Sequence, residues 1–328
     1  MSDSYSKAVD AYKKGDSKKA IKYFKKTISI LDKMGKLKLK GEILQNLAFS
    51  YVLDGQLEEG IKAMKESVLI FDKLKLSTKV VEGLAYIGAL NYKKKNNKLA
   101  LKYYKEAERI IKEKRLYNQC KEIEADICAD LGSVYDDENN FIVALENFNR
   151  AIKLYRKSNN EKGIARTYLD IGLLNFHQEN YEAAKSSIIK ALKGLKRFND
   201  IDNIADCHLI LGKIYREQKN WGSSLNECEK ALKFYELREN KLGIAESTLG
   251  IGIAKGSITG QEREGVKILQ QSLTLIKKLK DTFLEGLCLA WIAKVKKKLG
   301  DSDSVKYKNM AIKKLSIIGK EGMLAKIK

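Results

Sequence analysis

The sequence predicts an all-α fold, an α-solenoid of about eight helix-turn-helix repeats. The 328-residue chain contains no proline, and because proline breaks helix interiors its absence allows long uninterrupted helices. Glycines and other small residues recur at intervals of about 40 residues, and an internal period of that length is typical of stacked helical repeats. Hydrophobic residues make up 44% of the chain and charged residues 32%, which is enough apolar material for a core.

Five glycines share one register in the first helix expected for successive repeats. Glycine inside a helix costs about 1 kcal/mol relative to alanine, so a repeated glycine requires a packing reason. We predict that each allows the second helix of its repeat to approach closely. The intervals between the last four are 40 residues each, and the first interval is 44: Gly88, Gly132, Gly172, Gly212 and Gly252.

The second helices carry a matching register. Each begins with a small residue, usually followed four positions later by a bulky one and seven positions later by another small one, and this spacing places all three on one helical face. The first small residues are Ala20, Gly60, Ala100, Ala144, Ala184, Ser224, Gly265 and Ser304. Turn formers such as Gly15-Asp16 and Asn139-Asn140 separate the two helices of a repeat.

The expected domain organisation is a single solenoid over residues 1–320. Its repeats cover approximately residues 1–36, 37–76, 77–118, 119–160, 161–200, 201–240, 241–280 and 281–319. In the last of them Lys308 replaces the bulky apolar residue of the second helix, as the solvated face of a terminal repeat requires. Residues 320–328 are expected to form a basic C-terminal tail that completes this cap.

A glycine in the first helix followed by a small-x-x-x-bulky-x-x-small second helix resembles the tetratricopeptide repeat (TPR). The resemblance covers essentially the whole chain and implies a right-handed superhelix. Two features depart from the family pattern: the usual proline after the second helix is missing, and the period is about 40 rather than 34 residues. Both are similar to the extended repeats of Rap-type regulators, LGN-like scaffolds and kinesin light chains.

The glycine-rich stretch GIGIAKGSITG, residues 250–260, is not interpreted as a phosphate loop. The third glycine of the dinucleotide fingerprint is replaced by Lys255, and no GK[ST] follows Gly256. By register Gly252 is a helix-contact glycine. Gly256 and Gly260 then lie at the end of that helix and in the following turn.

No constellation for catalysis or metal binding is recognisable. The two histidines, His177 and His208, lie on different repeats without a nucleophile or carboxylate at catalytic spacing. Five scattered cysteines indicate reduced core thiols, and the acidic run 136–138 lacks EF-hand spacing. The sequence therefore predicts no enzyme, no cofactor and no metal.

The family resemblance implies that the first helices line a concave groove that binds a partner protein or an extended peptide. The chaperone-type carboxylate clamp is not expected, because its registers carry Val9, Phe49 and Ala89. An alternative interpretation remains for the apolar members, namely that Phe49 and Leu173 only pack between repeats. By register the groove residues are Tyr12, Phe49, Tyr92, Phe176, His177, Lys213 and Arg216, with Ser133, Leu173, Ile253, Lys294 and Lys297 as further members.

The net charge of +21 raises nucleic acid or an acidic membrane surface as a partner. Only nine of the 63 basic residues are arginines, whereas arginine is the usual reader of bases and phosphates. Lysine runs such as 93–95 and 296–298 end first helices, where cations suit the helix dipole. A protein-binding scaffold is therefore the preferred function, and a regulator that binds nucleic acid non-specifically through its basic surface is the alternative.

Cellular context follows from what the sequence lacks. No signal-peptide pattern and no run of 18 apolar residues occurs, so a cytoplasmic protein without membrane insertion is expected. A Rap-type peptide-sensing regulator would need an N-terminal effector domain. Because the first repeat begins within about ten residues of Met1, no such domain is expected.

Overall fold

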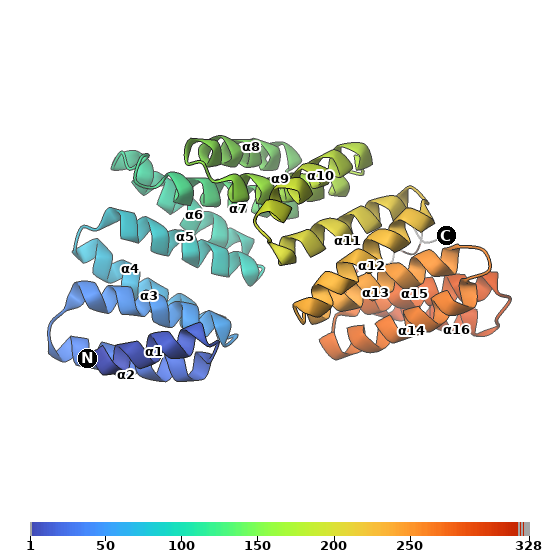
Figure 1. Ribbon diagram of the computed structural model, residues 1–328, viewed down its shortest axis with the longest axis horizontal. Coiled ribbons are helices and arrows are strands. Elements are labelled where there is room, and N and C mark those ends of the chain that lie inside the picture. The colour runs from blue at the N-terminus through green and yellow to red at the C-terminus, as the bar shows by residue number, and fades with distance from the viewer. Residues whose placement is uncertain (1, 321, 323, 325–328) are drawn as a thin grey trace. The chain divides into compact units, whose positions relative to one another are not determined.

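The computed structural model describes residues 2–320, 322 and 324, and these residues form helices and turns without any strand. The described helices pair in chain order, one pair in each expected repeat, and the predicted all-α repeat fold is confirmed (Figure 1). Residues 321, 323 and 325–328 of the expected basic tail lie outside the described residues. The helices are α1 (Ser2–Lys13), α2 (Ser17–Lys33), α3 (Leu37–Leu53), α4 (Leu57–Lys73), α5 (Ser77–Lys93), α6 (Asn97–Glu113), α7 (Lys121–Asp137), α8 (Phe141–Lys157), α9 (Glu161–His177), α10 (Tyr181–Arg197), α11 (Ile201–Glu217), α12 (Trp221–Leu237), α13 (Lys241–Ser257), α14 (Glu262–Leu279), α15 (Thr282–Lys298) and α16 (Asp303–Ser316).

The helices from α2 to α13 are each 17 residues long. Most of them end in a short turn that is closed by a residue in the left-handed region. The turn after α1 has the same form and is closed by Gly15, with φ of 74°. The N–H of the next residue, Asp16, then donates to the carbonyl of Ala11 at 2.9 Å, as in a Schellman motif. Other turns hold Lys75 or Asn139 in this conformation, with φ of 55° and 59°. A repeat without proline thus ends its helices by backbone hydrogen bonding.

The registered glycines lie where the two helices of a repeat meet, as the sequence predicts. A Cβ atom added to Gly132 would lie 2.5 Å from the Phe148 ring, closer than side chains approach one another in real structures. The partners of the other four glycines are the residues that follow the small residue of the next helix by four positions: Tyr104 for Gly88, Ile188 for Gly172, Cys228 for Gly212 and Leu269 for Gly252. The helix-contact interpretation of these glycines is confirmed.

The end of the glycine-rich stretch also agrees with the sequence prediction. Gly250, Gly252 and Gly256 lie within α13, and Gly260 follows in a turn with φ of 85°. The Gly256 backbone lies against Gly265 of α14, where a Cβ would lie 2.3 Å from the Gly256 nitrogen. These glycines therefore serve helix packing.

The chain divides into two compact units, residues 1–163 and 164–328. In the N-terminal unit one hydrophobic cluster joins α1 to α6 around Phe24 and Met64, and another joins α4 to α7 around Phe71 and Tyr104. The C-terminal unit has clusters around Ile188 and around Leu269. Each unit therefore has a core distributed along its helices.

Tyrosine–aspartate hydrogen bonds connect neighbouring helices. In the N-terminal unit the Tyr155 hydroxyl of α8 donates to Asp126 of α7. The same pair recurs two repeats later, where Tyr235 of α12 donates to Asp206 of α11 at 2.5 Å. Burial raises the pKa of Asp206, and burial together with Asp206 raises the pKa of Tyr235.

A third pair connects α6 with α7. The Tyr104 hydroxyl donates to Asp130 Oδ2 at 2.7 Å. Burial, with a smaller contribution from Asp126, raises the pKa of Asp130 to about 6, although the hydrogen bond from Tyr104 opposes the shift. In the folded state Asp130 therefore holds its proton at a pH where an unfolded aspartate, with a pKa of about 3.9, has lost it.

Gly265→Ala tests the helix contact most severely, because the added methyl group would meet backbone rather than a movable side chain. We expect the free energy of unfolding to fall by about 1–3 kcal/mol through overpacking. Gly222→Ala is the matched control, since no atom lies within 4 Å of the position its Cβ would take; it should gain up to about 1 kcal/mol from helix propensity. Urea denaturation of both variants measures the difference, and equal effects would contradict the contact.

Asp130→Asn tests the half-buried carboxyl group that accepts from Tyr104. Because the folded pKa of Asp130 is raised, unfolding releases a proton between about pH 4 and 6, so the parent loses stability across that window as pH rises. The asparagine variant accepts the same hydrogen bond but has no such loss. Its stability relative to the parent should therefore increase from pH 4 to about pH 7 in denaturation experiments. A difference that does not depend on pH would contradict the assignment.

Candidate functional site

The odd-numbered helices form one layer within each unit. In the N-terminal unit α5 contacts α7 in addition to its even-numbered neighbours, and in the C-terminal unit α13 contacts both α11 and α15. Each odd helix is buried against even helices on its other sides. In the N-terminal unit this leaves one stripe along each of α3, α5 and α7 at the surface.

In the N-terminal unit three successive odd helices expose the same three register positions, and we call these nine residues the odd-helix face. All nine are half-buried, whereas adjacent positions such as Leu47 and Ala48 are buried. Several members have small side chains, which leaves room beside the larger ones. The nine residues are Gln45, Asn46 and Phe49 of α3, Ala85, Tyr86 and Ala89 of α5, and Ala129, Asp130 and Ser133 of α7.

An aromatic pair is the main feature of the odd-helix face. The rings of Phe49 and Tyr86 meet edge to face, with centroids 4.8 Å apart and an interplanar angle of 83°. Tyr12 of α1 packs on the same hydrophobic cluster. Burial, together with Tyr12, raises the pKa of Tyr86 to about 12. The structure thus brings two predicted site residues, Tyr12 and Phe49, to the same place as Tyr86, which the sequence reasoning missed.

A signal for Tyr86 was present in the sequence. It lies three positions before Ala89, and Ala89 is the register equivalent of Phe49 one repeat later. Residues three apart share a helix face, so the register that contains Phe49 and Ala89 also points to Tyr86. From α5 the predicted groove set contains Tyr92 and not Tyr86, although Tyr86 lies on the stripe that α5 leaves at the surface.

Tyr92, also predicted, lies at the end of α5 and connects two odd helices. Its hydroxyl donates to the carbonyl of Ser133 in α7 at 3.4 Å, and Lys95 Nζ lies 5.6 Å from its ring centroid. The tyrosine is half-buried against the second hydrophobic cluster of the unit. Its side chain therefore contributes to the spacing of α5 and α7.

The predicted residues of the C-terminal unit take part in intramolecular contacts. Phe176 is half-buried, with its ring centroid 5.9 Å from that of Tyr181. Lys213 Nζ pairs with Glu246 Oε2 at 2.5 Å, which joins α11 to α13. Arg216 pairs with its neighbour Glu217 at 2.7 Å.

Exposure distinguishes the remaining predicted positions. His177 is exposed at the end of α9, and Lys294 and Lys297 are exposed on α15. Ile253 is fully buried, so its inclusion among the surface residues was wrong: at that register α13 is enclosed by neighbouring helices. Phe49 and Leu173 are half-buried against hydrophobic clusters, so each has a packing role and some remaining exposure.

His208 and the cysteines, which carry potentially reactive groups, are buried in structural contacts. His208 Nδ1 lies 2.6 Å from Glu227 Oε2, and both side chains are buried between α11 and α12. All five cysteines are free and buried, as predicted; burial raises the pKa of Cys207 to about 12, which keeps it a thiol at neutral pH. No group of three potential ligands for a metal ion occurs among the described residues.

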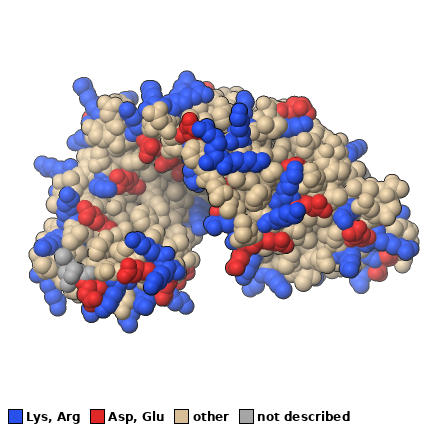
Figure 2. All heavy atoms as spheres, viewed as in Figure 1, with Lys and Arg blue, Asp and Glu red and all other residues tan. Residues whose placement is uncertain are grey.

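Charge is distributed unequally between the two sets of helices. The odd-numbered helices contain 17 basic and 17 acidic residues, whereas the even-numbered helices contain 33 and 16. Figure 2 shows basic side chains scattered over the visible face with fewer acidic ones between them. The positive excess of the chain is therefore carried by the even helices and the turns, and the odd helices together are neutral.

The described helices include none that combines the length and apolar character needed to cross a membrane. Two family models match the chain: soluble NSF attachment protein (SNAP) over residues 1–123, and the tetratricopeptide repeat over residues 125–158 and 165–193. The search of curated proteins gives no match.

Several solved structures share the fold. A signal transduction ATPase with a tetratricopeptide repeat sensor from Pyrococcus horikoshii has a TM-score of 0.67 at 16% identity over 93% of this chain, but the chain spans only 46% of that protein. Aspartyl phosphate phosphatase F from Bacillus subtilis has a TM-score of 0.66 at 14% identity, covering 87% of this chain and 73% of that one. A Rap protein complexed with competence and sporulation factor has a TM-score of 0.63 at 13% identity, covering 100% and 96%.

At these identities the solved structures show the fold alone, and the repeat models agree with the paired helices and the registered glycines. The chain is a TPR-like helical-repeat protein.

Proposed function

We propose that the chain is a non-enzymatic scaffold that binds a partner protein or an extended peptide on its odd-numbered helices. The observation that carries the proposal is the odd-helix face of the N-terminal unit, where the half-buried pair Phe49 and Tyr86 lies beside small residues and polar ones. Aromatic anchors surrounded by adaptable polar groups are what recognition of a peptide uses.

The polar members of the face suit an extended chain. Gln45 and Asn46 of α3 are half-buried and carry both donors and acceptors, so they can pair with a peptide backbone. Ala85, Ala89 and Ala129 leave room for side chains of the partner. In the C-terminal unit, the exposed His177 together with Phe176 and Arg216 is the corresponding set of candidate contacts.

Charge favours a protein partner over nucleic acid at this face. The odd helices have no net charge, whereas non-specific nucleic-acid binding depends on neutralising phosphates with an excess of lysine and arginine. The alternative of a nucleic-acid-binding regulator would therefore have to use other surfaces of the chain.

The matching proteins are consistent with a binding function for this chain. One matching family model describes an attachment protein, and the Rap protein was solved in complex with competence and sporulation factor. Another neighbour is named a phosphatase. We nonetheless propose binding rather than catalysis, because the aromatic and amide side chains of the odd-helix face supply recognition groups and not a nucleophile with its base.

Selection from a displayed library of random extended peptides tests the proposal. Peptides that bind the parent should lose about thirtyfold in affinity with Phe49→Ala and again with Tyr86→Ala, because truncating a buried interface anchor costs about 2 kcal/mol. Fluorescence polarisation of one selected peptide measures the loss, and circular dichroism checks the fold.

Tyr103→Ala is the matched control, since Tyr103 is a half-buried aromatic residue on the even helix α6. It should leave peptide binding unchanged. If selected peptides bind the Phe49 and Tyr86 variants as tightly as the parent, or if the Tyr103 variant loses binding equally, the odd-helix face is not the binding surface.

A further inference from the structure

One edge of the N-terminal unit collects the turns that lead from an even helix to the next odd helix. Because consecutive helices are antiparallel and joined by short turns, these turns all lie at the same end of the helices (Figure 1). We call them the even-to-odd edge; they comprise residues 33–37, 73–77, 113–121 and 157–161, each counted from the last residue of one helix to the first of the next.

The even-to-odd edge exposes large apolar side chains at the tips of its turns. Met34 and Leu37 are each 49% exposed, Tyr117 is 48% exposed and Leu74 is 36% exposed. The opposite edge, made of residues 13–17, 53–57, 93–97 and 137–141, has Leu53 as its exposed large apolar side chain among the described residues. The apolar tips are thus concentrated on one of the two edges.

Basic residues are concentrated on the same edge. Its four turns contain eight basic and two acidic residues. The four turns of the opposite edge contain five basic and four acidic residues. Lys33, Lys36, Lys73 and Lys75 are exposed, and none of them belongs to an ion pair of the described residues. On the opposite edge Lys94 pairs with Glu58 and Lys95 pairs with Asp137 at 3.6 Å, while Lys13, Lys14 and Lys93 are exposed.

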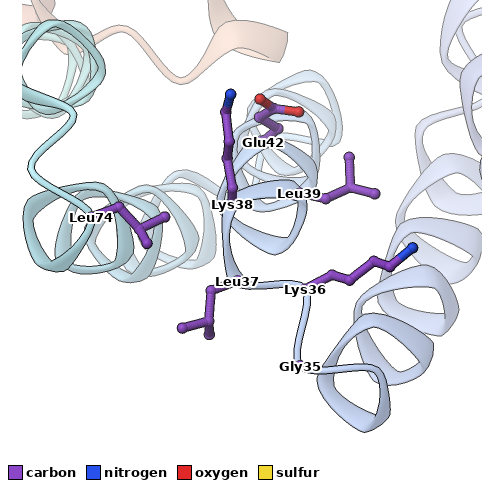
Figure 3. A pocket seen from close by; sticks show the side chains of 7 residues that line it. All are labelled: Gly35, Lys36, Leu37, Lys38, Leu39, Glu42 and Leu74. Carbon is purple, nitrogen blue, oxygen red and sulfur yellow. The ribbon is translucent and has the colours of Figure 1, made fainter.

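A pocket of about 550 Å³ lies between the first two turns of the even-to-odd edge. Figure 3 shows that Leu37, Leu39 and Leu74 line it together with Lys36 and Lys38, and that the one carboxylate in its lining is Glu42. Apolar walls with ammonium groups beside them are complementary to an amphiphile that has an acyl part and an anionic head.

We propose that the even-to-odd edge of the N-terminal unit docks on the surface of a bilayer that contains anionic lipids. Apolar tips on successive turns enter the boundary between headgroups and acyl chains, and the unpaired lysines lie over the anionic headgroups. Each lysine near such a surface contributes about fivefold in binding. The long lysine stems can lie along apolar material while the ammonium groups reach the headgroups.

The composition of the edge favours a lipid surface over other anionic partners. Binding of single-stranded nucleic acid uses rows of aromatic side chains on which bases stack, but three of the four exposed tips are aliphatic and only Tyr117 is aromatic. The four tips belong to three successive turns, with Met34 and Leu37 on the first, and a lipid surface can contact several turns together.

Co-sedimentation with vesicles tests the proposal. The full chain should bind vesicles of phosphatidylcholine with phosphatidylserine and not vesicles of phosphatidylcholine alone, and binding should weaken as ionic strength rises from about 0.01 to about 0.15 M. Replacing Lys36, Lys73 and Lys75 with glutamine should lower the partition coefficient about a hundredfold. The double change Leu37→Ser and Leu74→Ser should lower it about tenfold.

The control substitutions come from the opposite edge. Glutamine at the exposed positions Lys13, Lys14 and Lys93 removes the same charge, and Leu53→Ser removes a similar apolar tip; both should retain binding. The proposal is overturned if the phosphatidylserine vesicles are not bound preferentially, or if the controls lose as much binding as the edge variants. It is also overturned if a labelled single-stranded oligonucleotide binds more tightly than the vesicles and through the same three lysines.

Discussion

The close approach of two helices at a glycine is the constraint on which the rest of the structure depends. Where Gly132 faces Phe148 and Gly172 faces Ile188, a side chain on the glycine would occupy the space of its partner. The bulky residue instead fills the space above the glycine, and the next small residue of the even helix packs one turn later. Because this contact recurs every 40 to 44 residues, each repeat presents a similar surface to its neighbour and the repeats can stack.

This contact could be predicted from the sequence because it requires a residue with no side chain, and glycine is otherwise unfavourable inside a helix. The turns were less predictable. The closing residue of a turn is left-handed whether it is Gly15, Lys75 or Asn139, so residue type identifies only some of the turns. The backbone hydrogen bonds that close the motif compensate for the strain of the non-glycine residues.

The candidate site was predicted in part. Phe49 and Tyr12 lie in the aromatic cluster, but Tyr86 was missed and Ile253 proved to be buried. Both errors have the same cause: a register identifies equivalent positions, whereas exposure depends on how neighbouring helices cover each position. The tyrosine–aspartate pairs were not foreseen for a related reason, since Tyr155 and Asp126 are 29 residues apart and only the helix packing brings them together.

The distribution of charge connects these features with function. The odd helices are neutral while the even helices and the edge turns carry the excess of lysine, so one chain can offer a neutral surface to a polypeptide and a basic surface to an anionic partner. The repeat makes this separation possible, because alternate helices face different surroundings and can vary independently once the glycine contact is kept.

Deleting one repeat in register measures most directly whether neighbouring repeats are the unit of stability. Removal of residues 201–240, which are α11 and α12 with their turns, joins two equivalent positions and keeps every remaining type of contact. The product should retain the helical content per residue of the parent and melt cooperatively by circular dichroism. Removal of residues 201–230 breaks the register and should abolish cooperative melting. If the two deletions behave alike, the repeated glycine contact does not determine the fold.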